Sequence, residues 1–172
     1  MKTNLNSRFA LAMNARIHHY SPEKYWKRRS FVVRKQHGFF KKLLQYYYLY
    51  YIKKCDAFNC ASMGTDLGRG AEFASAPHLP HGLNGIVVSH FAKIGKNCRI
   101  HQQVTIATKK INGKYVSATI GDNCYLGAKS TVLGGVTIGN RVKVGANAVV
   151  TKDVPDNCIV AGVPAKIIKE LK

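Results

Sequence analysis

The chain has 172 residues, a length that suits one compact unit with a small appendage. Its 27 Lys and Arg against 8 Asp and Glu give a formal charge of +19, which favours anionic partners such as a phosphorylated cofactor, an acidic polymer, a membrane surface or nucleic acid. The five cysteines are an odd number without CxxC spacing, which argues against a disulfide framework or a zinc cage and indicates a reducing compartment.

Residues 1–60 are predicted to form a basic, aromatic, α-helical N-terminal region. Ser21 and Pro22 indicate a helix start, with serine as the cap and proline at the first helical position. A second helix is predicted over residues 39–54. No segment resembles a signal peptide, and the uncharged run 43–52 is about half as long as a membrane-spanning helix, so we expect a cytoplasmic protein.

The second predicted helix carries a basic, tyrosine-rich surface that allows three interpretations. It packs on the rest of the chain or on a neighbouring subunit, which is the first expectation. Alternatively, it lies at the inner face of a membrane as a peripheral contact, near a lipid-linked substrate. Nucleic-acid binding is less favoured, because charge alone gives nonspecific attraction and the sequence contains no recognised nucleic-acid module.

Residues 61–172 are predicted as one repeat domain, because aliphatic residues recur there every six positions. Four residues after most of these markers comes a second, small or branched residue. The markers are Val88, Ile94, Ile100, Ile106, Ile120, Leu126, Val132, Ile138, Val144 and Val150. The second set comprises Ala92, Cys98, Val104, Cys124, Ser130, Val136, Val142, Ala148 and Val154.

A period of six is neither helical nor that of a plain strand. Short flat strands that end in corners, repeated three times, close a triangular coil of roughly eighteen residues. The markers then point inward, and glycine and asparagine serve corners that need unusual backbone angles. The sequence therefore predicts a mainly β protein, a parallel β-helix.

Two interruptions and the end of the repeat complete the expected organisation. The phase breaks by three residues over 83–86, and a polar loop over 108–119 protrudes from the coil. Loops on rigid scaffolds are frequent places for chemistry. After Pro155 the repeat ends, and residues 161–166 are expected to lead into a short basic C-terminal helix.

Residues 64–172 resemble the hexapeptide-repeat acyltransferases, with the serine acetyltransferase branch nearest. The resemblance rests on residues 79–81 followed by Gly-Ile-Val-Val at 85–88, on residues 100–106, and on Ala-Gly-Val-Pro-Ala at 161–165. It implies a left-handed β-helix. The N-terminal region further resembles the capsule and exopolysaccharide O-acetyltransferases of this branch.

The same resemblance implies that His81 is the catalytic base and that Asp66, fifteen residues earlier, orients it. A hydroxyl is a weak nucleophile near neutral pH, so a neutral imidazole must take its proton as it attacks a thioester. A carboxylate on the other ring nitrogen fixes the tautomer and stabilises the imidazolium. Alternatively, His81 is an ordinary loop histidine.

Coenzyme A is the co-substrate that the resemblance implies. Small residues would let its pantetheine arm pass along the coil, although corner packing alone also explains each of them. Lysines near the C-terminal end would hold its phosphates. The small residues are Ala107, Thr108, Gly127, Ala128 and Ala146, and the lysines are Lys152, Lys166 and Lys169.

The acceptor is predicted from departures from the serine acetyltransferase pattern. Pro80 stands where those enzymes have an aspartate that binds the serine amine, and Val116 and Ser117 stand where they have an Arg-His pair. We therefore expect an acetyl-CoA-dependent O-acetyltransferase that acts on a sugar hydroxyl in surface polysaccharide synthesis. We also expect a homotrimer. Serine O-acetylation is the enzymatic alternative, and a noncatalytic or zinc-binding β-helix is the alternative of another class.

Three more histidines are candidates without an assigned role. His78 and His81 form an HxxH pair, but the close downstream pair of the zinc-binding β-helical carbonic anhydrases is absent, so no metal is expected. His90 and His101 are expected to line the cleft or a subunit contact, where either could meet the acceptor.

Overall fold

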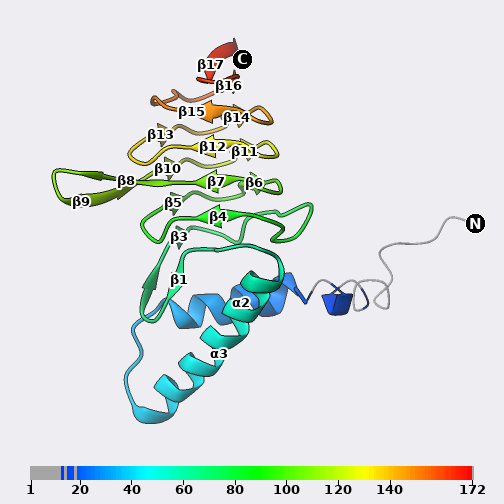
Figure 1. Ribbon diagram of the computed structural model, residues 1–172, viewed down its shortest axis with the longest axis vertical. Coiled ribbons are helices and arrows are strands. Elements are labelled where there is room, and N and C mark those ends of the chain that lie inside the picture. The colour runs from blue at the N-terminus through cyan, green and yellow to red at the C-terminus, as the bar shows by residue number, and fades with distance from the viewer. Residues whose placement is uncertain (1–12, 14, 18, 172) are drawn as a thin grey trace, which may run out of the picture.

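The computed structural model describes residues 13, 15–17 and 19–171. Two helices form a base, and a stack of coils rises from it (Figure 1). Each coil contributes short strands to three parallel sheets, so the chain is a parallel β-helix and mainly β, as predicted.

We name the three sheets after their strands in one coil. The β4 sheet contains β4 (Val87–Val88), β7 (Thr105–Ile106), β12 (Thr131–Val132) and β15 (Val149–Val150). The β5 sheet contains β3 (Glu72–Phe73), β5 (Lys93–Ile94), β10 (Thr119–Ile120) and β13 (Thr137–Ile138). The β6 sheet contains β6 (Arg99–Ile100), β11 (Tyr125–Leu126), β14 (Lys143–Val144), β16 (Cys158–Ala161) and β17 (Lys166–Glu170).

The register of the coils confirms the inward stack. Val88 pairs with Ile106, which pairs with Val132, so each marker lies over the marker of the next coil. All ten markers are at most 3% exposed, and the nine residues of the second predicted set are buried with them. Apolar burial of this regularity, close-packed along the whole coil, holds the solenoid together.

Asparagine and glycine have different structural roles at the corners. Asn97, Asn123 and Asn147 adopt positive φ values of 54°, 57° and 57°, as predicted. The glycines that follow the markers do not share this conformation and serve close approach between coils instead. At Gly121, for example, a Cβ would lie 2.7 Å from the carbonyl carbon of Gly139.

The helical base consists of α2 (Pro22–Val32) and α3 (Phe39–Phe58). Helix α2 begins at the predicted proline, although the Ser21 side chain makes no capping hydrogen bond. Helix α3 runs four residues beyond the predicted end at Lys54. It ends at Phe58 and the first strand begins at Thr65, on either side of the expected domain boundary. Among the described residues, neither helix combines the length and the hydrophobicity that crossing a membrane requires.

The expected C-terminal helix is wrong, because residues 166–170 form strand β17. The chain turns back at residues 162–165, and β17 pairs antiparallel with β16. An unpaired sheet edge exposes hydrogen-bonding groups, and β17 covers the edge of β16. The β-branched pair Ile167–Ile168 favours a strand here.

Candidate functional site

The functional residues gather at one corner of the prism, which we call the pocket corner. It is the turn between the β4 sheet and the β5 sheet, made of residues 64–71, 89–92, 107–118, 133–136 and 151–153. The opposite end of the β4 sheet turns into the β6 sheet at the His81 corner, made of residues 79–86, 101–104, 127–130 and 145–148.

The first coil contains an insertion at the pocket corner. Ser62 pairs with Val87 and Glu72 with Lys93, yet ten positions separate the first residues of these pairs and six separate the second. The extra residues form a hairpin of β1 (Thr65–Asp66) and β2 (Arg69–Gly70). This hairpin places Asp66 beside the next coil.

A second insertion lies two coils further on, at the same corner. The predicted loop 108–119 is a hairpin of β8 (Thr108–Ile111) and β9 (Lys114–Ser117), and it projects sideways from the stack (Figure 1). Its root rests on Gly134, where a Cβ would overlap the backbone nitrogen of Lys109. Only glycine leaves room for the hairpin at this position.

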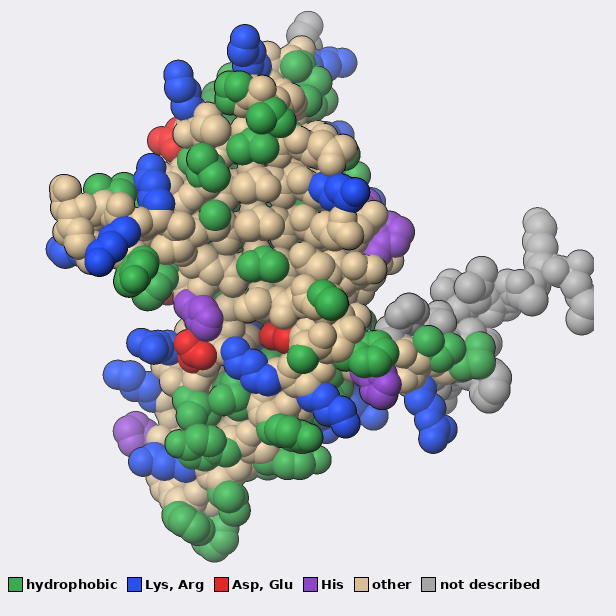
Figure 2. Space-filling view, viewed as in Figure 1, with side chains coloured by type: hydrophobic (Ala, Val, Ile, Leu, Met, Phe, Trp, Pro, Cys, Tyr) green, Lys and Arg blue, Asp and Glu red, His purple; other side chains and the backbone are tan. Residues whose placement is uncertain are grey.

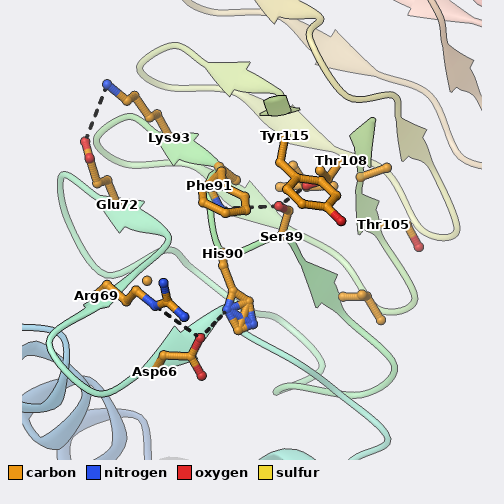
Figure 3. A pocket seen from close by; sticks show the side chains of 15 residues that line it. Asp66, Arg69, Glu72, Ser89, His90, Phe91, Lys93, Thr105, Thr108 and Tyr115 are labelled. Atoms are coloured by element: carbon orange, nitrogen blue, oxygen red, sulfur yellow. Dashed lines mark hydrogen bonds and ion pairs between the residues drawn. The ribbon is translucent and has the colours of Figure 1, made fainter. Parts of the chain in front are cut away.

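Between the two hairpins lies a pocket of about 870 Å³. Residues of the first hairpin line one side, residues 89–93 line the back, and Ala107, Thr108 and Tyr115 line the other side. Phe91 and Tyr115 stack with ring centroids 6.0 Å apart and planes 3° apart, and both side chains are exposed (Figure 3). The hydroxyls of Ser89 and Thr108 are hydrogen-bonded to each other.

A histidine–carboxylate pair lies in this pocket. His90 Nδ1 is 2.9 Å from Asp66 Oδ2, and both side chains are 36% exposed, so a substrate can reach them (Figure 3). An ionised carboxylate only accepts hydrogen bonds, so in the neutral imidazole Nδ1 carries the proton and Nε2 is an acceptor. The pair thus has the chemistry of an oriented general base.

The helical base holds the hairpin that carries Asp66. The buried Arg29 of α2 donates to Thr65 Oγ1 at 3.0 Å, Met63 O at 3.0 Å and Ala71 O at 2.7 Å. Burial lowers the pKa of this guanidinium to about 10. Gly64 has a φ of +55°, and a Cβ there would lie 2.8 Å from Ser89 O, so only glycine lets the first coil approach the turn that carries His90.

Charges of both signs surround the pair. Arg69 Nε lies 3.8 Å from Asp66 Oδ2, and Lys53 Nζ from α3 lies 4.0 Å from the other carboxylate oxygen. Across the pocket, Lys93 Nζ is 3.9 Å from Glu72 Oε2. The pocket therefore offers groups for an anionic ligand and groups for a cationic one.

The expectation that Asp66 orients His81 is wrong within one chain. A spacing of fifteen residues would be nearly one regular coil, but the β1–β2 insertion moves Asp66 to the pocket corner. His81 is exposed at the other end of the β4 sheet, on a separate insertion: nine positions separate His78 from Val87, against six between Arg99 and Thr105. The predicted base and its predicted partner therefore lie at different corners.

The ring of His81 lies near other aromatic rings. Its ring centroid lies 5.8 Å from that of His101, which in turn lies 4.8 Å from that of Tyr125. Burial, and then the nearby His81, lower the pKa of His101. The buried Nε2 of His101 has no hydrogen-bond partner among the described residues. A catalytic role for His81 stays a prediction from resemblance.

The predicted coenzyme A residues divide between three places. Ala107 and Thr108 line the pocket, and Lys152 belongs to the same corner two coils on. The other small residues belong to the His81 corner, and the two remaining lysines lie on the C-terminal strand. These are Gly127, Ala128 and Ala146 at the corner, and Lys166 and Lys169 on β17.

The sequence alone assigns no role to His90 beyond lining the cleft or a subunit contact, where it could meet the acceptor. The available signal was the pair Gly68 and Gly70, which punctuates residues 64–71 as a turn rather than a regular rung. Among the described residues, no group of three His, Cys, Asp or Glu could hold a metal ion.

Comparison with known proteins agrees with this architecture. Residues 117–152 match the family described as "Bacterial transferase hexapeptide (six repeats)". The serine acetyltransferase of Synechococcus elongatus is 38% identical over 106 residues, which cover 61% of this chain and 43% of that protein. The chain thus spans about half the length of the curated relatives it matches.

Solved structures show the same relationship. A serine acetyltransferase from Brucella abortus strain S19 superposes with a TM-score of 0.62 at 30% identity. The aligned part covers 77% of this chain and 51% of the Brucella chain. The same organism's enzyme in complex with coenzyme A has a TM-score of 0.69 at 25% identity, with 87% and 55% covered. The chain therefore has the left-handed β-helix fold, and it resembles the serine acetyltransferases among the hexapeptide-repeat acyltransferases.

Proposed function

We propose that the protein is an acetyl-CoA-dependent O-acetyltransferase whose active site is the pocket at the pocket corner. One observation carries this proposal: an oriented His90–Asp66 pair lies within a pocket on a β-helix of the acyltransferase type. The sequence-based proposal of His81 as the base gives way to His90, because His90 has both the carboxylate partner and the pocket.

The two residues divide the proton chemistry. Asp66 holds the proton on Nδ1 of His90, which keeps Nε2 free to accept the proton of an acceptor hydroxyl. As the imidazole becomes charged, the carboxylate stabilises it. General-base assistance of this kind contributes roughly 10²–10⁴-fold. Arg69 and Lys53 lie within 4.0 Å of the same carboxylate, so cations flank the pair.

The pocket suits one end of acetyl-CoA, which supplies the activated acetyl group. The small side chain of Ala107 leaves space beside Thr108 in the pocket lining. The pocket volume of about 870 Å³ falls in the range of cofactor sites. Lys93 and Arg69 place cations at the pocket, where phosphates would be attracted.

Serine is the first candidate acceptor. The relatives and the solved structures that resemble the chain are serine acetyltransferases. Serine is a zwitterion, and the chain lacks the charged groups of the serine acetyltransferase pattern at positions 80, 116 and 117. The pocket supplies charges from other positions, namely the carboxylates of Asp66 and Glu72 and the cations of Arg69 and Lys93.

A sugar hydroxyl is the second candidate, and it rests on the stacked pair Phe91 and Tyr115. Their exposed rings border the pocket, and flat aromatic faces suit the apolar face of a sugar ring. The replacement of the serine-binding groups by Pro80, Val116 and Ser117 supports the same acceptor. Synthesis of surface polysaccharide would be the setting for this activity.

A homotrimer is part of the proposal. The outward residues of the β4 sheet, Val87, Thr105, Thr131 and Val149, are uncharged, whereas the other two sheets present charges such as Lys93 and Arg99. Three prisms with this sheet toward a common axis would bring the pocket corner of one copy beside the His81 corner of the next. The divided coenzyme A residues would then face a single cleft.

The test is release of free thiol from acetyl-CoA by the full chain, with L-serine in one series and oligosaccharides in another. Turnover with serine supports the first acceptor, and turnover with oligosaccharides alone supports the second. Acetyl-CoA that neither binds in calorimetry nor reacts with either acceptor class would overturn the proposed activity.

A further inference from the structure

Helix α3 presents a bare apolar surface to solvent. Its exposed side chains include Phe39 at 76%, Phe40 at 82%, Leu43 at 59%, Tyr46 at 59%, Tyr47 at 60% and Tyr50 at 66%. These six residues form what we call the α3 patch. The patch lies at the end of the molecule farthest from the C-terminus, and Figure 2 shows hydrophobic side chains gathered there with Lys and Arg around them.

The patch is one continuous face of the helix. Phe39, Leu43, Tyr46 and Tyr50 follow one another at intervals of four, three and four, so they lie along a single stripe. The opposite face, with Gln45, Ile52 and Cys55, is buried and packs toward α2 and the first coil. Contiguous apolar surface of this kind is uncommon on a protein without a partner and marks an interaction site.

The charges around the patch identify the kind of partner. Residues 34–54 contain six Lys or Arg and no Asp or Glu. Arg34, Lys35, Lys41 and Lys42 are exposed, and the described residues provide no ion pair for any of them. A second copy of this surface would bring like charges together, which opposes self-association. An anionic partner removes that repulsion.

We propose that the α3 patch binds the surface of an anionic lipid bilayer. Tyrosine and phenylalanine rings settle at the boundary between headgroups and acyl chains, and flanking lysines attract anionic headgroups. The helix would lie in the plane of the interface with the β-helix standing away from it. This proposal is independent of the proposed acetyl transfer, because no residue of the patch lines the pocket.

Cosedimentation of the full chain with vesicles tests the proposal. We expect binding to vesicles of equal phosphatidylglycerol and phosphatidylcholine, weak binding to pure phosphatidylcholine, and release by high salt. Phe40→Ser with Tyr47→Ser, and separately Lys41→Gln with Lys42→Gln, should each weaken the partition roughly tenfold or more. All four side chains are exposed, so the variants should keep the wild-type circular dichroism spectrum and Tm.

Matched variants on the β-helix distinguish the patch from net charge and from general stickiness. Lys96→Gln with Lys143→Gln removes the same charge, and Ile167→Ser with Ile168→Ser removes exposed apolar groups elsewhere. Both should bind like the wild type. Equal weakening by these controls, or no cosedimentation with anionic vesicles, would overturn the proposal. So would sedimentation velocity showing that the Phe40/Tyr47 variant separates copies that the wild type holds together.

Discussion

The two corners at the ends of the β4 sheet are built from the same six-residue repeat, yet they differ in the residues inserted into that repeat. At the pocket corner, two inserted hairpins lie on either side of one regular turn. The space between them is a pocket that contains a histidine hydrogen-bonded to a carboxylate. The His81 corner receives three extra residues, and its exposed histidine lies near the ring of His101, which in turn lies near Tyr125. In a solenoid the regular coils supply the support, and the insertions decide where chemistry can occur.

Replacing Asp66 by Asn should have the largest effect on the pocket corner. An amide can present its NH₂ to His90 and favour the wrong tautomer, so acetyl transfer should fall roughly 10²–10⁴-fold with little change in Tm. Steady-state kinetics would show this. The double variant with His90→Ala should be no slower than His90→Ala alone, because the two residues act as a unit. Additive losses of activity in the double variant would show that Asp66 and His90 act independently, which would contradict the proposed pair.

Replacing Tyr20 by Phe tests the helical support beneath the His81 corner, where the Tyr20 ring lies against Gly82. Burial raises the pKa of Tyr20 from 10.0 to about 12. The native state therefore holds this proton more tightly, so the contribution is complete below pH 10 and is lost as pH rises toward 12. Between those values the wild type should lose about 3 kcal/mol that the variant does not lose.

Denaturant unfolding at several pH values measures that difference. Tyr47→Phe is the matched control, because Tyr47 is exposed on α3 and its replacement should leave the pH dependence of the wild type. An identical alkaline loss of stability in wild type and Tyr20→Phe would contradict the burial argument.

Replacing Gly134 by Ala should move the β8–β9 hairpin, because the new Cβ would overlap the backbone of Lys109. Displacing the Tyr115 side of the pocket by about an ångström should slow acetyl transfer by up to about 10²-fold. Gly121→Ala is the control. Its Cβ would lie 2.7 Å from the backbone of Gly139, but at the remaining corner, between the β5 sheet and the β6 sheet. Both variants should lower Tm, and only Gly134→Ala should lower the activity of the remaining folded protein.

The regular part of the fold could be predicted because each position repeats one physical demand. Ile94, Ile120 and Ile138 occupy one inward stack, so a single pattern describes all of them. The C-terminal segment could not be assigned in the same way. Ile167 and Ile168 between lysines fit a helix or a strand, and the open edge of β16 decides between the two.

The site was only partly predictable, because insertions have no period. Asp66 was recognised as functional, but its partner depends on where the β1–β2 hairpin turns, and Gly64, Gly68 and Gly70 determine that path. Counting fifteen residues to His81 assumed a regular coil. Ala107 and Thr108 line the pocket, because Ile106 ends its strand at this corner; coenzyme A binding by these two residues stays a prediction.

The most direct measurement compares His90→Ala with His81→Ala in the acetyl-CoA thiol-release assay, with both variants confirmed as folded. His90→Ala should lose roughly 10²–10⁴-fold in kcat/KM, while His81→Ala should retain activity within about tenfold of the wild type. A collapse of activity in His81→Ala together with near-normal turnover in His90→Ala would contradict the assignment of the base to the pocket corner.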